Sequence, residues 1–106
     1  MATEVGEKVR ALRKKKGLTL DQLAEMTNTS KSRIWELENR DNARPTAEKI
    51  HRIAEVLEVT PEYLMASGSG PPDDEEADRA FYRQYKRMPT ETRRKIRAMV
   101  KLWSDD

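Results

Sequence analysis

Apolar residues recur every three or four positions through residues 5–57, which is the spacing of one face of a helix. Four stripes can be distinguished: Val5, Val9 and Leu12; Leu20, Leu23, Ala24 and Met26; Ile34 and Leu37; and Ile50, Ile53, Ala54 and Leu57. No segment shows the two-residue alternation and β-branched enrichment of a strand. The pattern therefore predicts an all-α fold.

The residues between the stripes are typical of helix ends. Side chains that can cap a helix N-terminus stand at Thr19, Ser30, Thr46 and Thr60. Pro61 follows the last of these caps and predicts a short fifth helix with proline in its first turn. Gly17 and Asn28 tolerate the left-handed conformation of a tight turn. Five helices are therefore expected in residues 1–66.

Residues 67–72, Ser-Gly-Ser-Gly-Pro-Pro, predict a linker, because this composition cannot continue a helix. The remaining residues, 73–106, predict two helices separated at Met88-Pro89-Thr90. Their apolar stripes are Ala77, Phe81, Tyr85 and Met88, followed by Ile96, Met99, Val100 and Trp103. We expect the two helices to form an antiparallel hairpin.

A lone hairpin buries too little apolar surface to be stable. Its stripe can pack on a second copy of the chain, on the fifth helix of the same chain, or on another protein, and we favour dimerisation. The residues expected to make the dimer or partner contact are Phe81, Tyr85, Ile96, Met99, Val100 and Trp103.

Composition excludes several classes of chemistry. The 106 residues include no Cys, which excludes disulfide scaffolds, thiolate metal sites and thiol catalysis, and one His, which is too few for a metal site built from several histidines. We therefore expect no metal, no cofactor and no enzymatic activity. No apolar run approaches the ~18 residues of a membrane span, and the first residues do not resemble a signal peptide. A cytoplasmic protein without membrane contact is expected.

The second and third expected helices are separated only by Thr27-Asn28-Thr29, which is the layout of a helix-turn-helix. In such a pair the N-terminus of the second helix points outward. Its free N–H groups suit phosphates, and small polar side chains there can reach base edges in the major groove.

Residues 18–39, Pro45 and residues 50–64 resemble the XRE family of phage-repressor and Cro-like helix-turn-helix proteins. The resemblance covers about residues 5–66, without a gap. It implies a five-helix lambda-repressor-like bundle whose third helix enters the major groove of double-stranded DNA. It also implies binding as a homodimer to a two-fold symmetric operator.

The resemblance carries functional roles over to positions in this chain. Base contacts are expected from Ser30, Lys31, Ser32 and Glu36. Contacts to the DNA backbone are expected from Thr19, Gln22, Arg33, Trp35, Asn39, Arg40 and Arg44. Arg13 and Glu38 occupy the places of a structural ion pair between the first and third helices.

Four residues depart from the family pattern. Asn28 replaces Gly, which is a mild change, and Thr29 replaces Val or Ile, which weakens an apolar contact before the third helix. Arg40 replaces Gly, so we expect Asn39 to end the helix in the left-handed conformation. Trp35 replaces a small residue, and it serves either packing or DNA contact.

These observations favour a sequence-specific transcriptional regulator, most simply a dimeric repressor. The alternative is an interaction protein, such as an antitoxin that holds a toxin through its C-terminal hairpin.

Overall fold

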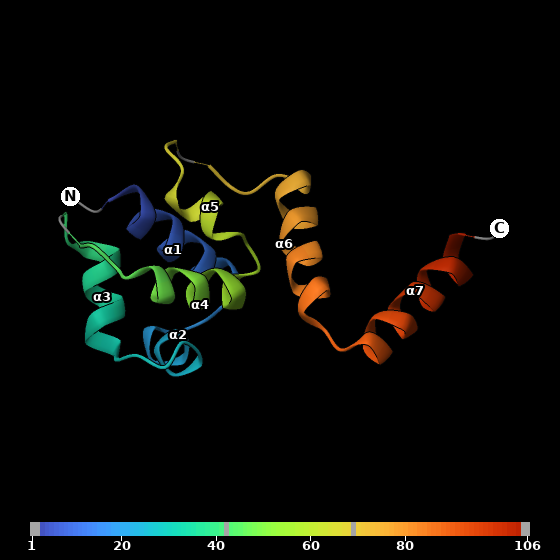
Figure 1. Cartoon of the computed structure of the whole chain (residues 1–106). Coiled ribbons are helices and arrows are strands. Elements are labelled where there is room, and N and C mark those ends of the chain that lie inside the picture. The colour runs from blue at the N-terminus through green and yellow to red at the C-terminus, as the bar shows by residue number, and fades with distance from the viewer. Residues whose placement is uncertain (1–2, 42, 69, 105–106) are drawn as a thin grey trace.

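The computed structural model describes residues 3–41, 43–68 and 70–104, and every regular element within these ranges is a helix. The helices are α1 (Glu4–Lys15), α2 (Leu20–Met26), α3 (Lys31–Asn39), α4 (Ala47–Leu57), α5 (Pro61–Met65), α6 (Asp74–Arg87) and α7 (Thr90–Ser104). The first five gather into a bundle, α6 stands beside it, and α7 points away (Figure 1). The prediction of an all-α fold is confirmed.

Local sequence signals set the helix starts. The predicted N-caps Thr19, Ser30, Thr46 and Thr60 each accept a hydrogen bond from a backbone N–H in the first turn of the helix that follows. These bonds satisfy N–H groups that have no partner within the helix. The four predicted caps are therefore confirmed.

The predicted stripes supply most of the core of the bundle. The buried core residues are Val9, Leu12, Leu23, Ala24, Ile34, Leu37, Ile50, Ile53, Ala54, Leu57, Val59 and Leu64, of which the last two lie outside the four stripes. Met26 is an exception, because 56% of its surface is exposed. Its assignment to the stripe was wrong, because Met26 is the last residue of α2 and its side chain lies outside the core that Leu23 and Ala24 join.

Helix α6 meets the bundle through a face that the apolar pattern does not mark. Its buried residues are Glu76 and Ala80, whereas Ala77 and Phe81 of the predicted stripe are exposed. Helix α7 has no buried residue along its length. Most of both apolar stripes therefore remains exposed, although Tyr85, Met88 and Ile96 are half-buried. Helix α6 contacts the bundle through polar residues and the small buried side chain of Ala80.

Candidate nucleic-acid interface

The turn between α2 and α3 is closed by hydrogen bonds. The hydroxyl of Thr27 donates to Leu23 O (2.7 Å), and the amide of Thr29 donates to Ala24 O (2.9 Å). Asn28 lies between them with a φ of 55°, the left-handed conformation that Asn tolerates. The turn thus fixes the direction in which α3 leaves α2.

Four exposed polar residues surround the start of α3: Ser30, Lys31, Ser32 and Arg33. The hydroxyl of Ser30 caps the helix by accepting a hydrogen bond from Arg33 N (3.2 Å). The positive end of the helix dipole and the first N–H groups of α3 face the same region. This arrangement suits an anionic ligand.

Lys31 and Glu36, two of the expected base-reading residues, have only loose charge partners. Lys31 Nζ lies 3.9 Å from Asp21, and Arg40 Nη2 lies 3.9 Å from Glu36. The side chains of both pairs are about half exposed or more, so each pair contributes about 0–1 kcal/mol. Both side chains can therefore exchange these partners for a ligand at little cost.

Thr19 and Gln22 bond to each other at the start of α2. Thr19 Oγ1 accepts from Gln22 N (3.0 Å), and Gln22 Oε1 accepts from Thr19 N (2.8 Å). This reciprocal arrangement is a capping box. The capping box engages the amide oxygen of Gln22. The NH₂ group of the same side chain takes no part in the box, and it is the group that can donate to a phosphate.

The remaining expected backbone contacts lie on or just after α3. Trp35 is 48% exposed, and Arg33, Asn39, Arg40 and Arg44 are exposed as well. The cationic side chains among them therefore extend the polar surface from the start of α3 to its end.

The expectation that Asn39 adopts the left-handed conformation was wrong. Asn39 is the last residue of α3, and Arg40 follows with extended backbone, φ −89° and ψ 141°. The Asn39 side chain donates from Nδ2 to Trp35 O (2.8 Å) and so satisfies one of the last carbonyls of the helix. Because the chain leaves α3 in an extended direction, no left-handed residue is required.

Arg13 and Glu38 meet between α1 and α3. Arg13 Nε lies 2.7 Å from Glu38 Oε2, and Arg13 Nη2 lies 3.0 Å from Glu38 Oε1. A third bond runs from Arg13 Nη1 to Leu18 O (2.8 Å). The hydrogen bonds to Glu38, together with its charge, raise the pKa of Arg13, although burial opposes this. The pair ties the end of α3 to α1 and therefore supports the exposed face of α3.

One contact beside α3 has no signal in the sequence pattern. Lys49 Nζ, on the first turn of α4, donates to the hydroxyl of half-buried Thr29 (2.9 Å). A polar bond therefore stands where the family pattern has an apolar residue. Lys49 also brings a positive charge next to the turn that precedes α3.

The residues expected to contact a second copy or a partner lie on α6 and α7. The rings of Phe81 and Tyr85 stack with centroids 6.1 Å apart, and Arg97 donates to the hydroxyl of Tyr85 (2.7 Å). Ile96 lies near them in an open apolar groove. Met99, Val100 and Trp103 are more than half exposed, with Trp103 at 80%.

The part of the chain that the structure describes contains no group of three or more His, Asp or Glu side chains able to hold a metal ion. Within the same ranges, no helix is both long and apolar enough to cross a membrane.

Comparison with known proteins places this chain in a family. The model of a helix-turn-helix domain matches residues 6–67, and the chain belongs to this family. The resemblance to repressor-like helix-turn-helix proteins is confirmed.

Among named relatives, the HTH-type transcriptional repressor RghR of Bacillus subtilis (strain 168) is 38% identical over 60 residues. That match covers 57% of this chain and 44% of RghR, so the chain spans less than half of that relative. Such relatives are transcriptional regulators rather than enzymes.

Two solved structures are similar. The crystal structure of SinR, the master regulator for biofilm formation of Bacillus subtilis, in complex with DNA has a TM-score of 0.55 at 27% identity, covering 58% of this chain and 98% of that one. The SinR/SinI complex has a TM-score of 0.58 at 20% identity and covers 96% of this chain and 99% of that one. The second likeness shows that the fold extends over nearly the whole chain.

Proposed function

We propose that this chain is a sequence-specific DNA-binding regulator of transcription that represses by occluding a promoter. The observation that carries the proposal is the exposed group Ser30, Lys31 and Ser32 at the N-terminus of α3. The turn around Asn28 and the buried Arg13–Glu38 pair hold this group in place. Similarity to a named repressor, RghR, and to SinR, which has been crystallised with DNA, supports the same function.

Discrimination between bases rests on the start and the middle of α3. In the major groove, Lys31 donates to O6 and N7 of guanine, and Glu36 accepts from the amino group of cytosine. Ser30 and Ser32 can serve either as donors or as acceptors. Because Lys31 and Glu36 have only loose partners in the free protein, DNA contact breaks no strong interaction.

The residues around this group provide affinity without sequence preference. Arg33, Arg40 and Arg44 neutralise phosphates and release counterions, which makes binding weaker at high salt. Thr19 and Gln22 at the start of α2, with Trp35 and Asn39 on α3, contact the sugar-phosphate backbone. These contacts set the register in which α3 meets the bases.

The repressor acts as a homodimer on a two-fold symmetric operator. Helix-turn-helix units that read one face of DNA lie about one helical turn apart, ~34 Å, and symmetric half-sites require a symmetric pair of chains. The open apolar surface of α6 and α7 is the contact that joins the two copies.

A second candidate function is that of an antitoxin or another protein that holds a partner through α6 and α7. The same exposed stripe of Met99, Val100 and Trp103 favours it. Purification of the untagged chain with its neighbouring gene product would test this function. A stable complex with a small toxin would establish it, and the two functions can coexist in one protein.

Selection of bound sites from random DNA, followed by binding measurements on single variants, tests the main proposal. Lys31→Ala should lose ~1–3 kcal/mol of discrimination at one base pair in each half-site. Arg44→Ala should weaken binding to all sequences alike and flatten the dependence on salt. Lys95→Ala, on exposed α7, is the matched control and should bind as the wild type does. The proposal is wrong if random selection yields no preferred sequence, or if Lys31→Ala and Arg44→Ala both behave as the control.

A further inference from the structure

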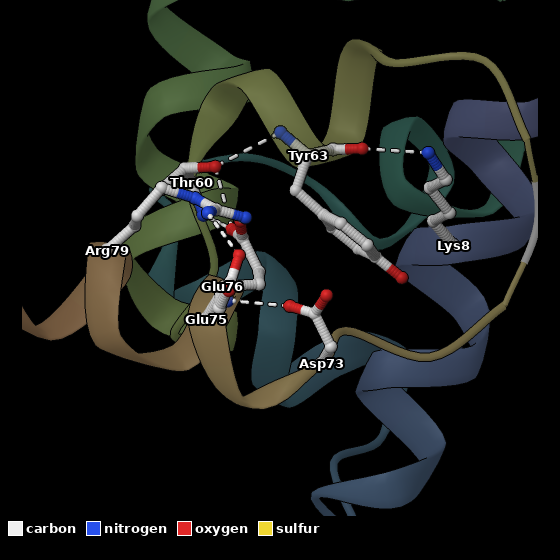
Figure 2. Close-up of polar contacts among 7 residues, drawn as sticks. All are labelled: Lys8, Thr60, Tyr63, Asp73, Glu75, Glu76 and Arg79. Atoms are coloured by element: carbon white, nitrogen blue, oxygen red, sulfur yellow. Dashed lines mark hydrogen bonds and ion pairs between the residues drawn. The ribbon is translucent and has the colours of Figure 1, made fainter.

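A carboxylate from α6 is buried against the start of α5 (Figure 2). Glu76 is only 3% exposed. Its Oε1 accepts hydrogen bonds from both the amide and the hydroxyl of Thr60, each at 2.7 Å, and its Oε2 accepts one from Arg79 Nη2 (3.1 Å). A buried carboxylate is costly unless it is hydrogen-bonded in this way, so the contact is specific in geometry.

Glu76 also binds the residue that caps the N-terminus of α5. Thr60 is the N-cap of α5, and its hydroxyl accepts a bond from Tyr63 N (3.1 Å) while it donates to Glu76. Asp73 in turn caps α6 by accepting from Glu76 N (2.8 Å). The helix-turn-helix family match ends at residue 67, so a residue beyond it finishes the last helix of the domain.

Helix α6 is held along its length as well as at its start. Ala80 is buried, one turn after Glu76. Farther along α6, Arg83 lies 3.6 Å from Glu62, and Arg87 lies 3.2 Å from Glu55. These exposed ion pairs contribute little individually, so the buried carboxylate of Glu76 is the strongest candidate for the polar contact that fixes α6.

The chain that leaves α5 is tied down too. Lys8 Nζ donates to the carbonyls of Tyr63 and Ala66, both at 2.7 Å, and its ammonium lies 4.7 Å from the centre of the Tyr63 ring. The hydroxyl of Tyr63 donates to Gly70 O. The junction between α5 and α6 is therefore fixed at both ends.

We propose that Glu76 is a positioning residue that fixes α6 to the DNA-binding bundle. The contact between Glu76 and Thr60, called here the α5–α6 joint, then sets the spacing of half-sites that the dimer selects. The inference rests on the proposed function as a dimeric DNA-binding protein. A free linker of the length of residues 67–72 would have a root-mean-square reach of about 13 Å. One base pair along DNA is about 3.4 Å. With a flexible connection between α5 and α6, the dimer would thus bind half-sites at several spacings. A fixed connection selects one spacing.

Gel-shift titrations against operators that differ only in the distance between two identical half-sites test the inference. The wild type should bind one spacing best. Glu76→Ala should lower the ratio between the best and the worst spacing by roughly tenfold, because avidity depends on a geometry that permits both contacts. Glu76→Gln keeps an acceptor for Thr60 and should restore much of the preference. Glu75→Ala, which removes an exposed neighbouring carboxylate, should match the wild type.

Nuclear magnetic resonance on the full chain provides a readout that needs no DNA. In the wild type, relaxation of amides in α6 and in α1–α5 should report a single rigid unit, and the Thr60 amide should exchange slowly. If Glu76→Ala does not fold, the wild-type relaxation data and the spacing profile of Glu76→Gln test the inference in its place. Independent motion of α6 in the wild type, or a spacing profile unchanged in folded Glu76→Ala, overturns the inference. A wild type that is rigid but binds no DNA overturns the proposed function and the role in spacing, and it leaves the joint itself established.

Discussion

Two charged side chains that lie almost wholly inside the bundle, Arg13 and Glu38, illustrate what single residues decide. Their side chains are 10% and 1% exposed. Taking two charges out of water costs several kcal/mol per ion, and two parallel hydrogen bonds offset that cost only while both partners are present. The pair is therefore a poor source of net stability, but its disruption is expensive.

We expect Glu38→Ala to lower the free energy of unfolding by ~3 kcal/mol or more, because it leaves the Arg13 guanidinium buried without a counter-charge. Chemical denaturation followed by circular dichroism measures this. Glu48→Ala is the matched control, since it removes an exposed carboxylate that pairs with Arg52 four residues later, and it should cost less than about 0.5 kcal/mol. Equal losses in the two variants would show that burial of the pair is not decisive.

Gly6 lies where α1 passes closest to α3. A Cβ atom at this position would lie 2.2 Å from Leu37 O, which is backbone that cannot rotate away. We expect Gly6→Ala to destabilise the fold by ~1–3 kcal/mol through overpacking, although alanine is the better helix former. Arg10→Ala, on the exposed side of α1, should change stability by less than ~0.5 kcal/mol. A Gly6→Ala protein as stable as the wild type would mean that the two helices can separate freely.

The roles of some of these residues can be predicted from the sequence, and those of others cannot. The positions of Arg13 and Glu38 follow from the family resemblance, and the structure brings them together. Gly6 and the bond between Lys49 and Thr29 could not be foreseen, because both depend on how close two helices pass. Helical spacing within one element does not contain that distance.

At the scale of elements, the N-caps of the bundle helices were predictable and the docking face of α6 was not. A cap is read from a residue and the three that follow it, so Thr46 and Thr60 are visible in the sequence. The face of α6 that meets the bundle is centred on Glu76, a charged residue that a search for apolar stripes passes over. Its partner, Thr60, lies sixteen positions away, so the bond has no local signature.

Tyr63, at the junction between α5 and α6, predicts that the stability of the fold depends on pH. Burial raises the pKa of Tyr63 above its ordinary value of 10.0, and the charges of Glu76 and Asp73 raise it further. The folded chain therefore holds this proton more tightly than the unfolded chain does. The resulting stabilisation is complete below the ordinary pKa and is lost as the pH rises through the higher, folded value.

We therefore expect the free energy of unfolding of the wild type to fall more steeply above about pH 10 than that of Tyr63→Phe, which has no phenol to ionise. Urea denaturation at a series of alkaline pH values measures the difference between the two curves. Tyr82→Phe, at an exposed tyrosine of α6, should follow the wild type. Parallel curves for the wild type and Tyr63→Phe would show that this phenol titrates alike in the folded and unfolded chains.

At the scale of the whole molecule, the chain is elongated, with principal extents of 51 × 27 × 24 Å, because α7 points away from the bundle (Figure 1). Helix α7 has 15 residues and none of them is buried. Isolated helices of about 12–15 residues are marginal in water, so α7 needs a surface that covers its apolar stripe. In the proposed dimer, a second copy of the chain would supply that surface and also the two-fold symmetry that paired half-sites require.

We expect the full-length chain to be a dimer at tens of micromolar and Val100→Asp to be a folded monomer, because the new carboxylate would be desolvated in the proposed contact between the α6–α7 surfaces of the two copies. Val100 is 57% exposed, so the charge leaves the bundle intact. Ala98→Asp makes the same change of charge on the opposite side of α7 and should remain dimeric. Light scattering measures the masses, and gel shifts should show that Val100→Asp loses cooperative binding of the full operator while it still binds a half-site weakly. A wild type that is monomeric at these concentrations would contradict the dimer and favour a heterologous partner on the same stripe.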